Sequence, residues 1–315
     1  MSDPVIVDSH LHLFQTAEEC RTLKEDYDVW EFGRADDVRY SKYLGSIDDA
    51  VEAMEIAGVT KAISLSLFLG DLKRQSAIAA LPQGVTAAER EKAIAEIDAR
   101  LVDEMRAYNR WGCEVAKGRP QIVPFVSVDV TVLPGEAGAA HLRDLVEGHG
   151  AKGVKLHGAI QNYHMADPRL GPIYRVCEEL ELPIIGHSGS DKAGKGFAEP
   201  RAFGDLLKAH PRLRVVLAHL GGGAWRQTRE IAETYPNAYF DCCEIIEWTS
   251  GDNAPSDVQL ARLIQEVGAE RVMMGSDFPW YDLDHTIDRV QALPLLSDEE
   301  KTGILGRNAV AILGL

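Results

Sequence analysis

The chain has 315 residues, of which 45% are hydrophobic, an ordinary composition for a globular protein with a substantial core. Its formal net charge of −16 argues against nucleic acid or an anionic membrane as a partner, because phosphate binding depends on basic patches. No apolar run approaches a bilayer span, the first predicted strand begins too early for a signal peptide, and the five cysteines lack metal-finger spacing, so we expect a cytoplasmic protein.

The first predicted element is a short buried strand that ends in two histidines. Residues 5–7 are β-branched, as is typical of strands, and they lead into His10 and His12. Because side chains alternate along a strand, the two imidazoles point the same way. Converging imidazoles can share a metal ion, although a histidine pair alone is a modest signal.

Seven further strand-like runs follow, separated by helix-like stretches. The predicted strands are 61–65, 122–128, 153–156, 183–186, 215–218, 238–241 and 272–276. The predicted helices are 47–57, which ends at Gly58, and 87–116, 136–147, 168–181, 202–209, 225–234 and 256–267. Strands that alternate with helices predict a parallel sheet whose functional loops follow the carboxyl ends of the strands.

Eight strands are the number that a (β/α)8 TIM barrel requires, and the uniform composition argues for one domain over residues 1–315. The alternative is a doubly wound open sheet, which would spread the strand ends along a crevice instead of a ring. Two segments, 14–45 after the first strand and 68–119 after the second, exceed ordinary connection lengths and are interpreted as insertions. The first, with Tyr27 and Trp30, is either a lid over the site or a helical elaboration at the barrel side or an oligomer contact.

Four more residues of metal-binding type follow their own predicted strands. They are His157, His187, His219 and Asp277. In a barrel all these strand ends meet on one face, where such barrels carry their catalytic groups. Five of the predicted strands are thus followed by residues that can bind a metal, all at the same face of the barrel, and core packing does not explain this pattern well. In contrast, we interpret the adjacent Cys242 and Cys243 as small buried hydrophobic residues.

The ordered motifs resemble those of the amidohydrolase superfamily. They are Asp-x-His-x-His from Asp8, Lys-Leu-His from Lys155, His-Ser-Gly from His187, Ala-His-Leu-Gly-Gly-Gly around His219 and Gly-Ser-Asp-Phe-Pro around Asp277. Within the superfamily the chain is most similar to the amidohydrolase-related branch that includes aminocarboxymuconate-semialdehyde decarboxylase and many metal-dependent hydrolases. The stretch 304–315 also resembles the C-terminus of this branch. The resemblance covers residues 5–315 and is specific for the superfamily, but not for a substrate.

The resemblance implies one divalent ion at the barrel mouth, held by His10, His12, His187 and Asp277. Zinc is the expected ion, since three imidazoles and a carboxylate suit it, with manganese or a binuclear site as alternatives. His219 takes the place of a histidine near the metal-bound water, where it would be a general base or acid, or a ligand of a second ion. Asp277 would bind the ion and also take a proton from the water.

Other residues are candidates for binding the substrate. In some superfamily members a lysine near Lys155 is carboxylated and bridges two ions; we favour one ion and an unmodified Lys155, paired with Asp8 or with a substrate carboxylate. We expect His157 to line the pocket and Trp280 to stack on a ring, or else to pack a neighbouring loop. The glycines 221–223 let the backbone approach the site and open a helix near Arg226, and the N-terminus of that helix could hold a carboxylate.

The sequence predicts an enzyme for a small molecule, and a homo-oligomer is compatible with it. The main expectation is hydrolysis of a small organic acid, amide, ester or lactone by a zinc-activated water. The alternative is zinc-dependent, non-oxidative decarboxylation of a carboxylated ring or a muconate-type acid. A non-catalytic small-molecule-binding barrel is disfavoured, because every expected ligand is present. For a carboxylated substrate, the candidate anchoring cations are Arg34, Arg39, Lys192 and Arg226.

Overall fold

The computed structural model describes residues 5–25 and 31–315, and its strands form a ring. The strands are β1 (Val7–Leu11), β2 (Lys61–Leu65), β3 (Ile122–Ser127), β4 (Gly153–Leu156), β5 (Ile184–Gly186), β6 (Val215–Leu217), β7 (Ala238–Asp241) and β8 (Val272–Met273). All neighbours pair in parallel and in chain order. Backbone bonds from Ser9 N to Met274 O (2.9 Å) and from His12 N to Phe278 O (2.7 Å) join β1 to the segment after β8. The predicted TIM barrel is confirmed, and the open doubly wound sheet is excluded.

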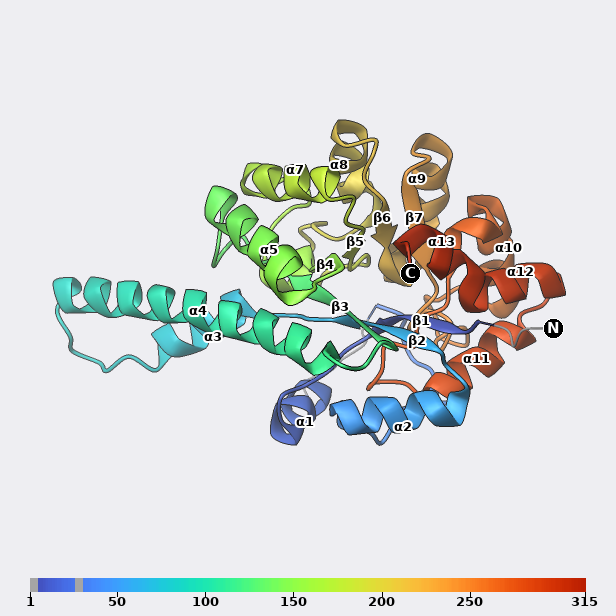
Figure 1. Cartoon of the computed structure of the whole chain (residues 1–315), viewed down its shortest axis with the longest axis horizontal. Helices are drawn as coiled ribbons and strands as arrows, with labels where there is room; N and C mark the ends of the chain where they lie inside the picture. Colours follow the sequence, from blue (N-terminus) through green and yellow to red (C-terminus); the bar gives the residue numbers. More distant parts are fainter. Residues whose placement is uncertain (1–4, 26–30) are drawn as a thin grey trace.

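Helices surround this ring (Figure 1). They are α1 (Ala17–Glu25), α2 (Ile47–Ala57), α3 (Gly70–Ala79), α4 (Ala87–Ala116), α5 (Gly135–His149), α6 (Gly158–Gln161), α7 (Gly171–Glu179), α8 (Gly204–Ala209), α9 (Thr228–Thr234), α10 (Asp257–Val267), α11 (Leu283–Ala292), α12 (Asp298–Thr302) and α13 (Asn308–Leu313). The predicted bounds of α2 and α4 are confirmed, because capping boxes at Ser46 and Thr86 define their starts. The predicted helices 168–181, 202–209 and 225–234 are shorter, because each is preceded by a 3-10 segment.

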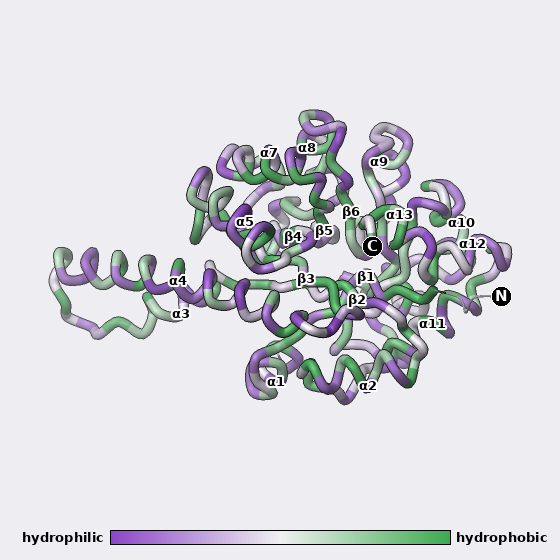
Figure 2. Tube along the Cα trace, in the orientation of Figure 1, coloured by the Kyte–Doolittle hydropathy of each residue, from purple (hydrophilic) through white to green (hydrophobic). Residues whose placement is uncertain are grey.

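The core has an inner and an outer part, and the inner part fills the lower barrel. Its buried side chains include Val7, Ile63, Phe125, Ile185, Val216 and Met273, and α13 adds Ile312 and Leu313. Figure 2 shows hydrophobic strands at the centre, while the surrounding helices alternate between hydrophobic and hydrophilic turns. Burial of each such side chain stabilises the fold by about 1.5–3 kcal/mol. The apolar filling ends below the carboxyl ends of the strands, where buried polar residues take over.

The two predicted insertions take different forms. In the second, α3 and α4 make an arm that projects from the barrel (Figure 1), held together by Arg74 Nε, which donates to Asp98 Oδ1 at 2.6 Å. The first contains α1 and then returns to the barrel mouth, where the Phe32 ring stacks on Trp248 at 5.7 Å. Tyr27 and Trp30 lie outside the described residues. Among the described residues, no helix combines the length and apolarity that crossing a bilayer requires.

Candidate metal centre

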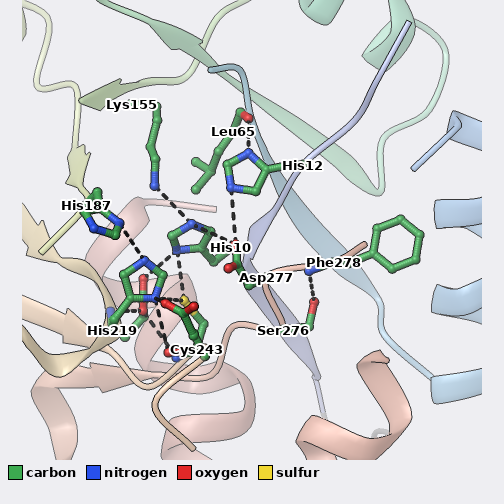
Figure 3. A network of polar contacts seen from close by, with 12 residues as sticks. His10, His12, Leu65, Lys155, His187, His219, Cys243, Ser276, Asp277 and Phe278 are labelled. Carbon is green, nitrogen blue, oxygen red and sulfur yellow. Dashed lines mark hydrogen bonds and ion pairs between the residues drawn. The ribbon is translucent and has the colours of Figure 1, made fainter. Parts of the chain in front are cut away.

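The ends of β1 and β8 bring His10, His12 and Asp277 together (Figure 3). The Nε2 atoms of His10 and His12 lie 3.5 and 3.3 Å from Asp277 Oδ1. Their other ring nitrogens are already engaged: His10 Nδ1 is 3.0 Å from Asp241 Oδ2, and His12 Nδ1 is 2.8 Å from Leu65 O. Metal-binding histidines are commonly oriented in this way by a carboxylate or carbonyl on the far side of the ring. Both Nε2 atoms are therefore aimed at one point beside the Asp277 carboxylate.

Asp8 locks the two ligand-bearing strand ends to each other. Its Oδ1 accepts from the backbone N–H groups of His10 (2.9 Å) and Ser276 (3.0 Å), and its Oδ2 accepts from the Ser276 hydroxyl at 2.5 Å. Burial raises the pKa of Asp8 to about 7, against the lowering effect of these hydrogen bonds. The N–H of Asp277 donates to His10 O at 2.7 Å. The spacing between the histidine pair and Asp277 is thus fixed by backbone as well as side-chain contacts.

His219 and His187 extend the cluster across the barrel. His219 Nε2 is 3.0 Å from His187 Nδ1, and the His187 ring stacks on His157 at 3.8 Å with the planes 11° apart. On the other side, His219 Nδ1 lies 3.4 Å from Glu244 Oε2. Burial lowers the pKa of all three histidines, which favours uncharged rings at neutral pH.

Lys155 contacts the cluster from β4. Its Nζ lies 3.0 Å from His10 Nε2, whereas the carboxylate of Asp8, one of the two partners expected from the sequence, is taken up by Ser276. Burial lowers the pKa of Lys155. Its side chain thus lies at the edge of the His10–Asp277 pair.

The donor set fits a divalent cation. Within residues 5–25 and 31–315, three groups have ligand atoms within 4.8 Å of one another: His10, His12 and Asp277; His10, His219 and Cys243; and His219, Glu244 and Asp277. His187, the fourth ligand expected from the resemblance, belongs to none of these groups and faces His219. The carboxylates of Asp277, Asp241 and Glu244 all act on the ammonium of Lys155, so a doubly charged cation would offset the remaining negative charge of the centre.

Positive backbone φ angles occur at three residues of the cluster: His219 (59°), Glu244 (59°) and Asp277 (58°). Such angles cost about 1–3 kcal/mol for residues other than glycine, and they persist where the surrounding structure imposes them. Here they occur in the segments that follow β6, β7 and β8, where the ligand atoms of the three side chains come within 4.8 Å of one another. Three such residues in one cluster therefore favour a functional site.

A cavity of about 570 Å³ opens above the cluster. The predicted site residues that line it are His10, His12, Lys155, His157, His187, His219, Asp277 and Trp280. Arg226 is not among the lining residues; it is exposed and lies over the Trp225 ring at 4.3 Å. Of the expected cationic anchors only Lys192 lines the cavity, whereas Arg39 pairs with Asp282 at 3.1 Å.

Four residues of the site were not anticipated as functional. Asp241 ends β7, so the strand-end rule that found the histidines could also have found it. Cys243 is buried, as expected, but its Sγ lies 3.1 Å from Nδ1 of both His10 and His219. Glu244 and Glu31 line the cavity, and nothing in the sequence marks them.

The carboxyl group of Glu31 is largely buried, and its ionisation should make the stability of the protein depend on pH. Burial raises its pKa from 4.5 to about 7, so the folded chain binds the proton more tightly than the unfolded chain does. Its contribution to stability is therefore present below about pH 4.5 and is lost as the pH rises through about 7. We expect Glu31→Gln to show a smaller fall in melting temperature than the wild type between pH 5 and 8. Identical pH slopes in thermal unfolding would contradict this.

Comparisons with known proteins identify the family of this chain and similar proteins. A family model described as "Amidohydrolase" matches residues 7–315. The 2-amino-3-carboxymuconate-6-semialdehyde decarboxylase of Dictyostelium discoideum is 25% identical over 212 residues, which are 57% of this chain and 58% of that protein. The match therefore spans little more than half of that relative. The gamma-resorcylate decarboxylase of Rhodococcus jostii is 25% identical over 223 residues, 57% of this chain and 67% of that protein.

A solved structure shows the likeness of fold over the full length. It is a dihydroxybenzoic acid decarboxylase from Polaromonas sp. with bound manganese and the inhibitor 2-nitroresorcinol. The TM-score is 0.66 at 17% identity, covering 100% of this chain and 98% of that one.

Proposed function

Because this chain belongs to the amidohydrolase family, we propose that it is a metal-dependent decarboxylase of a small carboxylated ring or a muconate-type acid. The observation that carries the proposal is a metal-binding cluster at the floor of a cavity of small-molecule size. Two relatives of this chain are named as decarboxylases, which supports loss of carbon dioxide over the hydrolysis that the sequence alone favours.

We assign one divalent ion to His10, His12 and Asp277, with His187 as the further ligand that the family pattern implies. When bound, the ion supplies a Lewis acid for the oxygens of the acid. Zinc suits this mixture of nitrogen and oxygen donors, and the manganese in the solved relative makes manganese the second choice. The pKa of Asp277 lies below its usual range: burial acts to raise it, but the hydrogen bond to His12 and the nearby histidines outweigh this effect. An ionised Asp277 suits metal binding.

Decarboxylation also needs a proton. The bond between the carbon and its carboxylate breaks, carbon dioxide leaves without the electron pair, and a proton must reach the carbon. We assign this transfer to His219, whose lowered pKa makes it a neutral imidazole that can accept a substrate proton and return it to carbon. Glu244 Oε2, 3.4 Å from Nδ1, stabilises the protonated ring. Asp277 is the alternative proton carrier.

The cavity walls favour a flat, compact ligand. Its apolar lining includes Phe14, Leu67, Leu69, Tyr108, Phe197 and Trp280. The Trp280 ring stands edge-on to His12 at 5.6 Å, so a planar ring above the metal cluster would have aromatic neighbours. Lys155 and Lys192 add positive charge at the floor and the rim. A carboxylated aromatic or conjugated acid matches both features.

Lys192, at the rim of the cavity, allows the charge of the substrate to be tested, with Arg226 as the matched control. Lys192→Ala should raise KM for a carboxylated substrate by about fivefold, the scale of an exposed ion pair. Arg226→Ala removes a similar charge outside the lining residues and should leave KM unchanged. Steady-state kinetics of both variants check this. If neither change affects KM for an acid that the protein turns over, Lys192 does not contact the substrate carboxylate.

The reaction itself is tested by its products. The protein, loaded with zinc or manganese, is incubated with 2,6-dihydroxybenzoate and related carboxylated rings, and separately with small amides, esters and lactones. We expect equimolar carbon dioxide and decarboxylated product from at least one acid, and none after chelation of the metal. A carboxylate product without carbon dioxide would instead support hydrolysis. Ligand affinity that persists without metal and without turnover would support a binding protein.

A further inference from the structure

Glu31 contacts the side of the barrel mouth that lies opposite β1. It belongs to the segment after β1, yet its carboxyl group lies against the loops after β5 and β6. The N–H of Ser190 donates to Glu31 Oε2 at 2.9 Å, and the backbone N–H of Gly223 also donates to this carboxyl group. In an eight-stranded ring in chain order, β5 stands opposite β1, so this contact spans the mouth.

The side chain of Glu31 also accounts for glycines in two of the sequence motifs. A Cβ at Gly189 would lie 3.0 Å from Glu31 Oε2, and one at Gly222 would lie 2.8 Å from Oε1. At Gly223 it would lie 2.8 Å from the Cβ of Glu31 itself. The backbone of both loops therefore closes around this one side chain, and any larger residue would push it away.

Those loops carry the two histidines at the far side of the cluster. Gly189 follows His187 by two positions, and Gly222 follows His219 by three. Glycine-rich loops have large conformational freedom, so their arrangement depends on contacts made from outside. The neighbour of Glu31, Phe32, is fixed as well: its carbonyl accepts from Asn253 N at 3.0 Å. Glu31 thus comes from an anchored point and ends on the backbone of both loops.

We propose that Glu31 is a positioning residue, which holds the loops after His187 and His219 in the arrangement that keeps these two rings in contact. Its carboxyl group acts through two backbone N–H donors and through close packing against the three glycines. His219 Nε2 and His187 Nδ1, 3.0 Å apart, are the atoms whose relative placement depends on it. This inference stands whichever reaction the site catalyses; only the kinetic measurement below rests on the proposed function.

Hydrogen–deuterium exchange on the metal-loaded protein tests the proposal without a substrate. In Glu31→Ala we expect backbone exchange in 187–197 and 218–227 to rise by about tenfold or more, because local opening of these loops is no longer opposed. Glu31→Gln keeps the shape and a carbonyl acceptor, so it should restore much of the protection. Asp36→Ala, an exposed acid of the same segment outside the cavity lining, is the matched control and should match the wild type. Unchanged exchange in Glu31→Ala, or no rescue by glutamine, would overturn the proposal.

A double-mutant comparison tests the packing directly. Gly189→Ala places a Cβ against both carboxyl oxygens of Glu31, at 3.0 and 3.2 Å, and leaves the φ angle unstrained. It should loosen the two loops in the wild type and have a smaller effect in the Glu31→Ala background. Equal effects in both backgrounds would show that the contact is not the one proposed.

Kinetics then separate positioning from folding. Once an acid that the protein decarboxylates has been identified, Glu31→Ala should lower kcat by about tenfold with little change in KM, because misplaced reacting groups slow the chemical step. Metal content and melting temperature are measured alongside. A second outcome is that the wild type and the variants all fail to decarboxylate any acid tested, while Glu31→Ala still speeds hydrogen–deuterium exchange in the two loops. That outcome would contradict the proposed reaction but support the role of Glu31. If Glu31→Ala keeps the full kcat, Glu31 does not position the site.

Discussion

His12→Ala is expected to lose its metal and its activity together. His12 Nε2 points at Asp277 Oδ1 from 3.3 Å, while its Nδ1 is held by the Leu65 carbonyl, so the ring has one orientation and presents Nε2 to the metal site. Outer residues that merely orient a ligand already change metal affinity by about 10–100-fold when removed, and a direct ligand should exceed that range. Elemental analysis after dialysis, with a competition titration, measures both content and affinity.

A matched control is available in α5. His149→Ala also removes one imidazole, but from a helix end where its nearest acid is Asp144, 3.9 Å away. It should keep the metal content and the turnover of the wild type. Full metal content in His12→Ala would show that the assigned ligand set is wrong.

His219→Asn is expected to separate proton transfer from metal binding. We choose asparagine because residue 219 has a φ of 59°, a region that asparagine tolerates better than alanine. If His219 carries the proton, the variant should retain its metal and lose turnover by about a hundredfold or more, the usual scale for a positioned acid or base. The pH dependence of the residual rate should also lose the limb that reports this imidazole.

Metal analysis and kinetics on the same preparation decide this case. Loss of metal in proportion to activity would make His219 a ligand and favour two ions, for which the group of His219, Glu244 and Asp277 offers the atoms. Near-normal turnover in a properly folded variant would move the proton transfer to Asp277.

The fold and most of the cluster follow from local sequence rules. Short β-branched runs are recognisable as strands, and the residues that follow them must meet at one end of a closed parallel barrel. These rules predict that His10, His219 and Asp277 lie together without any knowledge of long-range contacts, and the structure brings them to one cavity with His157. Helix starts are predicted equally well where a capping box is present, as at Thr86.

The remaining features depend on contacts that no local pattern encodes. Glu31 meets Ser190 across 159 positions of the chain, and neither residue type marks its role. Arg226 follows a glycine run suited to carboxylates, but its guanidinium lies over Trp225 instead of entering the cavity. The helix α1 buries little more than Cys20, so its apolar periodicity is too weak to identify it from the sequence.

The bond between Asp8 and Ser276 joins residues 268 positions apart, the one on β1 and the other in the segment that follows β8. A growing chain therefore makes its histidine pair long before the matching aspartate, Asp277. Until β8 docks, the pair lacks the Asp277 carboxylate, and the group of His10, His12 and Asp277 does not exist. Ion uptake should accordingly follow the docking of β8 and should favour the chain in which the ring has closed. The centre that we assign to catalysis would also record whether the barrel is complete.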